Sequence, residues 1–381
     1  MKKVILIPDS FKGTMSSSEI CAIMKERVNK HYPEAQVVSI PVADGGEGSV
    51  DAFLSATGGE KVRLTVKGPY LEEMEAFYGV IDGGAAAVIE MAACAGLPLV
   101  GTRLDPSKTS TYGVGQLIKA AAARGCKKII VGLGGSATND MGAGAAAGAG
   151  ARFFNGAGEE FIPTGGTLKD IARIDTSGLA KELRGGNSVK IITMCDIDNP
   201  LYGENGAAFV FAPQKGAGPE MVRMLDDGLR RAACVVKEQL GVDITSLAGA
   251  GAAGGMGGGM AAFFSSTLQM GIETVLDTVR FDEVVKGADY VFSGEGKIDR
   301  QSLRGKVVIG VARRAKKSGV PVIAVVGDIG DNIEGAYDEG VAAIFSINRV
   351  SQSFEENRKR CKSDLCLTVD NLLRFMRRSC N

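Results

Sequence analysis

The chain has 381 residues, which exceeds one compact domain of ordinary size and predicts two. Hydrophobic residues make up 45% of it, and the positive and negative side chains balance at 44 each, so there is no basic footprint for nucleic acid. No run of about 18 apolar residues appears, so we expect no membrane span and no membrane partner.

Two residue types narrow the chemistry further. The eight cysteines are scattered without a C-x-x-C pair, which favours reduced thiols in a cytoplasmic protein over disulfides or a zinc site. His31 is the only histidine, and its context NKHYPE is typical of an exposed helix end. A histidine-based triad would depend on that one residue, so Asp, Glu, Lys, Ser, Thr and the backbone remain for chemistry.

The N-terminal segment alternates apolar strands with helices. KVILIP at 3–8 predicts a first strand, and a capping box formed by Ser16 and Glu19 predicts the start of a helix. QVVSIPV at 36–42 predicts a second strand, which ends in the loop ADGGEG at 43–48. This order is typical of a parallel sheet with helices on its faces.

The middle of the chain differs from its two ends. We expect strands with little helix between them at 61–67, 75–81 and 86–91, then a helix near 112–124, strands at 127–133 and 189–195, and a long helix over 219–240. Simple alternation returns with strands at 288–294, 321–327 and 341–347, a helix over 302–317 and a final amphipathic helix. We therefore predict one α/β domain from 1–70 plus 286–381 and an inserted α/β domain at 71–285.

Six loops rich in glycine and charge follow the apolar strands or adjoin glycine clusters. They are 8–13, 43–48, 134–140, 196–200, 249–259 and 294–306. In open parallel sheets, ligands bind beyond the carboxyl ends of the strands. Glycine backbones offer N–H groups to phosphate, carboxylates hold Mg²⁺, and lysine neutralises phosphate or carboxylate. Together these are the groups that phosphoryl transfer requires.

Standard nucleotide motifs are missing from the sequence. Turn-forming glycines and helix-capping aspartates would explain any one of the loops, but six together favour phosphate handling. No G-x-x-x-x-G-K-[ST] occurs, and the G-x-G-x-x-G at Gly249, Gly251 and Gly254 lacks a clear preceding strand. The residues alone thus indicate a phosphate-handling α/β enzyme that depends on Mg²⁺.

Six ordered segments resemble the glycerate kinase family of bacteria. They are PDSFKG at 8–13, ADGGEG at 43–48, GGSATND at 134–140, CDIDNPL at 195–201, GAAGGMGGG at 251–259 and GEGKIDRQSLRGK at 294–306. The resemblance implies two α/β domains, one flavodoxin-like or Rossmann-like and built from both chain ends, with the active site in a cleft between them. It also implies transfer of the γ-phosphate of ATP, with Mg²⁺, to D-glycerate, giving ADP and a phosphoglycerate of the 2-phospho type. The family typically reads GGSATNDGG, and Met141 here replaces the first of the last two glycines.

Given this resemblance, we infer roles from residue type. The glycerate carboxylate needs a cation, for which Lys12 beside Ser10 is the first choice; the other expected substrate-binding residues are Asp9, Gly45, Gly46, Glu47 and Ser302. Asp196 or Asp44 would accept the hydroxyl proton. Lys306, or Arg304 instead, would balance the developing negative charge.

The remaining expected site residues bind phosphate and metal. The phosphate group comprises Gly134, Gly135, Ser136, Thr138, Asn139, Asp140, Gly254 and Gly255, and the candidate Mg²⁺ ligands are Asp198, Glu295 and Asp299. We expect a monomer or homodimer. Two alternatives stay open: a kinase of another small hydroxy acid, and a non-catalytic effector-binding protein that has kept the pocket.

Overall fold

The computed structural model describes residues 1–42, 45–184, 189–300 and 302–379. The chain divides into two compact units: unit 1 comprises residues 1–44, 55–57 and 272–381, and unit 2 comprises 45–54 and 58–271. Each has its own main sheet and its own hydrophobic core. The domain boundaries expected at 70/71 and 285/286 stay predictions. Strand β3 (Glu60–Lys67) lies in unit 2, since it pairs along its whole length with β4 (Glu73–Ile81) of that unit.

Unit 1 contains a five-stranded parallel sheet, which confirms the predicted α/β class. In spatial order its strands are β16 (Val341–Ser346), β14 (Val322–Val326), β12 (Tyr290–Gly294), β1 (Lys3–Pro8) and β2 (Gln36–Ser39). All four pairings are parallel. Counted along the unit's own strands, this is the 2-1-3-4-5 order of flavodoxin-like sheets. Both ends of the chain therefore build one sheet.

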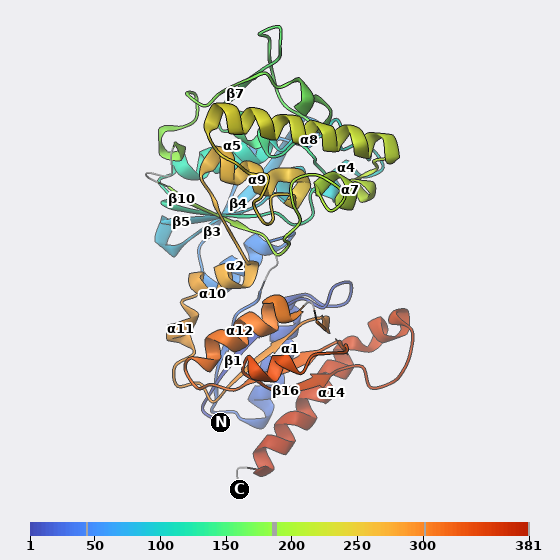
Figure 1. The fold of residues 1–381 in the computed structure, drawn as a ribbon. Coiled ribbons are helices and arrows are strands. Elements are labelled where there is room, and N and C mark those ends of the chain that lie inside the picture. The colour runs from blue at the N-terminus through green and yellow to red at the C-terminus, as the bar shows by residue number, and fades with distance from the viewer. Residues whose placement is uncertain (43–44, 185–188, 301, 380–381) are drawn as a thin grey trace. The chain divides into compact units, whose positions relative to one another are not determined.

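Helices cover this sheet (Figure 1). α1 (Ser17–His31) and α14 (Phe354–Ser379) pack against each other and against the core side chains of β1, whereas α12 (Val307–Lys316) contacts β12 and β14 outside that core. The predicted capping box is confirmed: Ser16 Oγ accepts from Glu19 N at 3.2 Å, and Glu19 Oε2 accepts from Ser16 N at 2.9 Å. His31 ends α1 but is not exposed as expected, because its Nε2 pairs with Asp370 Oδ1 of α14 at 2.8 Å.

Unit 2 contains a six-stranded mixed sheet. In spatial order its strands are β11 (Thr267–Gln269), β10 (Lys190–Met194), β6 (Lys128–Gly132), β5 (Ala86–Glu90), β4 and β3. The first four are parallel to one another, and β3 and β4 form an antiparallel extension. A separate small sheet has the order β8 (Glu160–Phe161), β7 (Arg152–Phe154) and β9 (Arg173–Asp175). The predicted mixed character of the middle segment is confirmed.

The remaining elements are mostly short. The helices that pack within the core of unit 2 include α5 (Tyr112–Ala123), α6 (Ala143–Gly148), α8 (Pro219–Leu240) and α9 (Ala252–Phe264). The other α-helices are α2 (Ser49–Thr57), α3 (Ala92–Ala95), α4 (Leu97–Val100), α7 (Ala207–Phe211), α10 (Gly271–Thr278), α11 (Phe281–Val284) and α13 (Gly335–Asp338). Strand β13 (Lys297–Ile298) pairs with β15 (Asp328–Ile329).

The glycine-dense segment 249–259 is not the loop that its composition predicted. Most of it belongs to α9, whose first residues Ala253, Gly254 and Gly255 have left-handed φ of 54°, 69° and 90° before regular helix follows. A Cβ on Gly259 would lie 1.9 Å from Met141 O. Glycine is therefore required here by close backbone packing, which overrides its low helix propensity.

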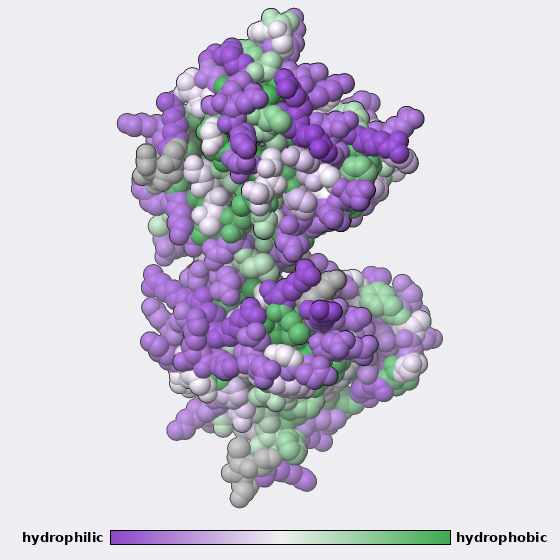
Figure 2. Space-filling model, viewed as in Figure 1, coloured by the Kyte–Doolittle hydropathy of each residue, from purple (hydrophilic) through white to green (hydrophobic). Residues whose placement is uncertain are grey.

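Within the described ranges, no helix combines the length and apolar character needed to cross a membrane. Hydrophilic side chains predominate on the face drawn in Figure 2, and apolar residues form scattered patches there. Three of the exposed apolar side chains, Phe354, Leu367 and Phe375, belong to α14.

Candidate functional site

Two of the predicted loops leave the carboxyl ends of adjacent strands in unit 1. Pro8 of β1 pairs in register with Gly294 of β12, so Asp9 and Glu295 are the next residues on neighbouring strands. The backbone N–H of Ser10 donates to Asp9 Oδ1 at 2.7 Å. β2 lies on one side of β1, while β12, β14 and β16 lie on the other, so the strand order reverses between β1 and β12. This is the topological switch point at which open parallel sheets bind ligands.

Glu295 is the buried carboxyl group of this edge. Its side chain is 5% exposed, and its Oε2 accepts a hydrogen bond from Ser302 Oγ at 3.0 Å, whereas Oε1 has no partner in the part of the chain that the structure describes. Burial raises the pKa of Glu295 to about 7, against the lowering effects of Ser302 and Lys306, and the carboxylate of Asp9 raises it further. A buried oxygen without a partner, on a group that ionises near neutral pH, is suited to hold a cation or to take a proton.

The turn beyond β12 is fixed by its own hydrogen bonds. Asp299 N donates to Ser302 Oγ at 3.2 Å, and Ser302 N donates to Asp299 O at 2.9 Å. Lys306 is exposed and occupies the N-cap position of α12. Lys12 is exposed in the loop after β1. The loops after β1 and β12 thus carry seven predicted site residues: Asp9, Ser10, Lys12, Glu295, Asp299, Ser302 and Lys306.

The other motif segments gather at the carboxyl edge of the parallel strands of unit 2. Glu90 of β5, Gly132 of β6 and Met194 of β10 pair in register, so the three strands end level. Two predicted loops leave β6 and β10 at this edge. Gly134 N donates to Gly45 O at 3.0 Å, so the segment after residue 44 lies against the loop after β6.

Close backbone contacts explain several glycines in and beside the motif segments of unit 2. A Cβ on Gly132 would lie 2.3 Å from Gly45 O, and a Cβ on Gly134 would lie 2.5 Å from Gly46 Cα. Gly254 is buried, and a Cβ there would lie 2.1 Å from Thr138 O. The proposed contact of Gly254 with phosphate stays a prediction. Its position shows a packing role beneath the loop after β6.

Asp140 is a fully buried acceptor within that loop. Its Oδ2 accepts hydrogen bonds from Thr111 N at 2.7 Å, Thr111 Oγ1 at 2.8 Å, Gly144 N at 3.2 Å and Ser110 Oγ at 3.4 Å, and its Oδ1 accepts from Gly142 N at 3.2 Å. Burial raises the pKa of Asp140, although hydrogen bonds from Thr111 and from the two glycines oppose the shift. Asp140 therefore ties the loop to the starts of α5 and α6.

Two buried charged residues of unit 2 were not predicted. Glu90 is 2% exposed, its Oε2 accepts from Val50 N at 3.0 Å near the start of α2, and burial raises its pKa. Lys215 is also 2% exposed, and its Nζ donates to Ser136 Oγ at 2.7 Å and to Thr138 O at 2.6 Å. A single charge ending the apolar run AAAVIE could have indicated Glu90. Lys215 stands among turn residues and gives no such signal.

Of the two candidates for the proton acceptor, Asp196 lies within the described residues. Asp196 lies on the exposed loop after β10, where its Oδ1 accepts from Gly271 N at 2.7 Å at the start of α10. Asp44 lies outside the described residues, so the structure gives it no geometry. Glu47 is exposed just before α2.

The predicted metal ligands belong to different units. Asp198 lies in unit 2 on the exposed loop after β10, and Glu295 and Asp299 lie in unit 1. No three His, Cys, Asp or Glu side chains converge as a metal site in the described ranges. Mg²⁺ is commonly held by one or two carboxylates together with substrate phosphates. The unpartnered Glu295 Oε1, close enough to Asp9 and Asp299 for their charges to raise its pKa, fits that kind of site.

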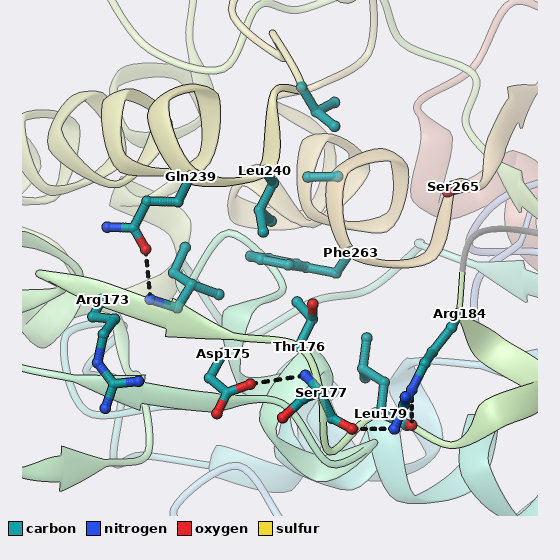
Figure 3. A pocket seen from close by; sticks show the side chains of 13 residues that line it. Arg173, Asp175, Thr176, Ser177, Leu179, Arg184, Gln239, Leu240, Phe263 and Ser265 are labelled. Carbon is teal, nitrogen blue, oxygen red and sulfur yellow. Dashed lines mark hydrogen bonds between the residues drawn. The ribbon is translucent and has the colours of Figure 1, made fainter.

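Unit 2 also has a cavity of about 630 Å³ near β9, drawn in Figure 3, and none of its lining residues belongs to the six motifs. Its polar groups hold the surrounding chain: Asp175 Oδ1 accepts from Ser177 N at 2.8 Å, and Arg184 Nε donates to Leu179 O at 2.8 Å. Its apolar lining includes Leu240 and Phe263. The motif loops, not this cavity, bring together the groups that phosphoryl transfer needs.

Comparisons with known proteins agree over almost the entire chain. The profile of the glycerate kinase family matches residues 4–377. A glycerate kinase of Bacillus cereus is 43% identical over 371 residues, and a glycerate 2-kinase of Escherichia coli is 41% identical over 371 residues; each alignment covers 97% of both chains. A solved structure from Salmonella typhimurium, described as glycerate kinase 2, is 40% identical and superposes with a TM-score of 0.87 over 99% of both chains.

Proposed function

Since the chain belongs to the glycerate kinase family and is a kinase, we propose that it transfers the γ-phosphate of ATP to D-glycerate, giving 2-phospho-D-glycerate and ADP. The observation that carries this proposal is the family match over 4–377, which spans all six motifs. Their position at the carboxyl edges of the two parallel strand sets supports it, because ligands bind there in open sheets. Dependence on ATP favours a cytoplasmic enzyme.

We assign the acceptor substrate to the loops of unit 1. Lys12 and Ser10 would bind the glycerate carboxylate, since an exposed ammonium beside a hydroxyl offers charge and a hydrogen bond. Glu295 and Asp299 would hold Mg²⁺ together with phosphate oxygens, and the ion would supply charge neutralisation when bound. Lys306, at the N-terminus of α12, would add positive charge against the transferred phosphoryl group.

We assign the phosphate contacts to the loop after β6 in unit 2. Its tip, Gly134, Gly135 and Ser136, is half-buried or exposed, and its base, Thr138 to Asp140, is buried. The tip would offer N–H groups and a hydroxyl to phosphate while the base holds the tip in place. In the reaction, the glycerate hydroxyl oxygen bonds to the γ-phosphorus, its proton passes to Asp196 or Asp44, and ADP leaves.

The test is ADP formation by the purified protein with ATP and Mg²⁺, with and without D-glycerate. We expect ADP release only with D-glycerate present, and phosphorus and proton NMR of the product should show phosphate on the hydroxyl at carbon 2. Absence of D-glycerate-stimulated ADP release would refute the proposal. L-glycerate and tartronate belong in the same panel, because faster turnover of either would assign the enzyme to another hydroxy acid.

A further inference from the structure

Lys215 lies beneath the loop that we assign to phosphate, yet it belongs to none of the six motifs. It ends a short 3-10 helix, Pro213–Lys215, and its side chain is buried in unit 2. Its ammonium donates to Ser136 Oγ at 2.7 Å and to Thr138 O at 2.6 Å. The two acceptors belong to the residues on either side of Ala137. A single lysine therefore bridges both ends of the turn 136–138.

The charge of Lys215 is poorly compensated within unit 2. Burial lowers its pKa to about 7, and the one opposing influence is the negative charge of Asp140. Asp140 is already occupied by five hydrogen bonds from backbone and hydroxyl donors. No carboxylate in the described ranges forms an ion pair with Lys215, and the third N–H of its ammonium has no partner there. A buried charge is normally paired or neutralised, and a ligand of opposite charge nearby would keep the proton on Lys215.

The same loop has further unsatisfied groups. Thr138 Oγ1 and both polar atoms of the Asn139 side chain are buried and have no partner in the described part of the chain. Buried polar groups in native proteins are nearly always hydrogen-bonded, so three unpaired atoms in consecutive residues need an explanation. They lie in the turn whose carbonyl oxygen at Thr138 accepts from Lys215.

The contact with Lys215 also determines whether the Ser136 hydroxyl donates or accepts. An ammonium can only donate, so Ser136 Oγ accepts from Lys215 and must direct its own O–H elsewhere. No acceptor for this O–H is found among the described residues, and Ser136 is only half-buried at the tip of the loop. The contact with Lys215 thus leaves the Ser136 hydroxyl hydrogen available to donate to a ligand.

We propose that Lys215 is a positioning residue which, by donating to Ser136 Oγ and Thr138 O, orients the Ser136 hydroxyl as a donor to a phosphoryl oxygen of ATP and places a positive charge beneath that oxygen. The inference rests on the proposed kinase function. It adds a residue from outside the motifs and a specific job for Ser136. Because Lys215 acts through Ser136, removing either one should remove most of the same effect.

The test is a double-mutant cycle with Lys215→Met, Ser136→Ala and the double variant. Methionine keeps the apolar stem of lysine and lacks its charge. We expect Lys215→Met to lower kcat/KM for ATP by about 100-fold, the loss typical of a missing oxyanion donor. The double variant should be little worse than Lys215→Met alone, because the two residues act as one unit. Multiplying losses in the double variant would overturn the inference, as would full activity of Lys215→Met.

Binding separates this inference from the proposed function. Calorimetric titration with ATP and with D-glycerate, in the absence of turnover, should show ATP affinity weakened in Lys215→Met and Ser136→Ala and D-glycerate affinity retained. Loss of D-glycerate affinity alone would overturn the assignment to phosphate. If the wild-type protein bound ATP but did not phosphorylate D-glycerate, the proposed function would fail while the ATP titrations still tested Lys215. Lys237→Met, an exposed lysine of α8, is the matched control for loss of one positive charge.

Discussion

Replacing Glu295 by glutamine removes one ionisable group and keeps the shape of the side chain. The pKa of Glu295 is raised from its ordinary value of 4.5 to about 7, chiefly by burial, so the folded protein binds this proton more tightly than the unfolded chain does. The contribution of protonated Glu295 to the stability of the fold is therefore fully present below about pH 4.5. It is lost as the pH rises through about 7. Each pKa unit corresponds to about 1.4 kcal/mol, so the raised pKa of Glu295 changes the free energy of unfolding by up to about 3 kcal/mol over this pH range.

Glutamine does not titrate, so the stability of Glu295→Gln relative to wild type should rise by up to about 3 kcal/mol between about pH 4.5 and about pH 8. Hydrogen exchange of peptides that cover β1 and β12 reports the opening free energy of unit 1 itself, which a global melt of a two-unit chain does not. The measurement is made with a chelator and without nucleotide. The control is Glu34→Gln, an exposed carboxylate of unit 1, whose pH profile should parallel that of wild type.

A stability difference between Glu295→Gln and wild type that stays flat over this pH range would refute the reasoning. It would mean that water or local motion solvates Glu295 and that its carboxyl is not buried in the way its 5% exposure indicates.

Three further substitutions test the packing that holds the motif loops and unit 1. Asp140→Ala removes the acceptor of five hydrogen bonds and should lower the urea unfolding free energy of unit 2 by about 3 kcal/mol or more. Gly254→Ala puts a Cβ 2.1 Å from Thr138 O at a φ of +69°, so we expect a loss of about 2–4 kcal/mol and weaker ATP binding by calorimetry. Arg314→Lys loses the bidentate pair with Asp282, whose two distances are both 2.8 Å, and should lower the melting temperature of the protein most at low salt.

Each of these predictions has its own control. Gly83 has a φ of +62° and open space around it, so Gly83→Ala introduces left-handed backbone strain without a clash. It should lower the free energy of unfolding by about 1–2 kcal/mol and leave ATP affinity unchanged. Equal effects of Gly83→Ala and Gly254→Ala would contradict the packing argument. Asp140→Asn keeps two acceptor sites and should fall between wild type and Asp140→Ala. For Arg314→Lys, a melting difference independent of salt would argue against an electrostatic cause.

Periodicity predicted most of the sheet strands because each is a short apolar run that helices or the other strands bury. The helix predicted over 219–240 is α8 (Pro219–Leu240), since one strongly apolar face and a terminal Gly241 mark both its packing side and its end. α9 could not be predicted in this way. Glycine has a low helix propensity, and the requirement that overrides it is contact with Met141, which is distant in sequence.

The candidate site was predictable where chemistry and local pattern coincide. Asp9 and Glu295 directly follow apolar strands, and the neighbouring strands bring them to one edge. Lys215 could not be found from sequence, because its significance comes from burial and from a partner 79 positions away. The exposure of Asp196 was equally hidden, since strand-end position alone does not tell which side of a loop faces solvent.

Met141 stands where the resemblance to the GGSATNDGG segment leads us to expect glycine, and it allows a sharp test. Its φ is +56°, a left-handed conformation that glycine adopts freely and that costs other residues about 1–2 kcal/mol. Its side chain is fully buried, and truncating a buried methionine costs about 2–5 kcal/mol. Met141→Gly should therefore be less stable than wild type, because the lost burial exceeds the relieved strain.

Met141→Ala loses the side chain and keeps the strain, so it should be less stable than Met141→Gly by about 1 kcal/mol, after the larger chain entropy of glycine is deducted. Urea unfolding of the three proteins should give the order wild type, Met141→Gly, Met141→Ala. If Met141→Ala were as stable as Met141→Gly, the left-handed backbone would carry no cost. The close approach of α9, where a Cβ on Gly259 would lie 1.9 Å from Met141 O, would then be the remaining backbone constraint at this position.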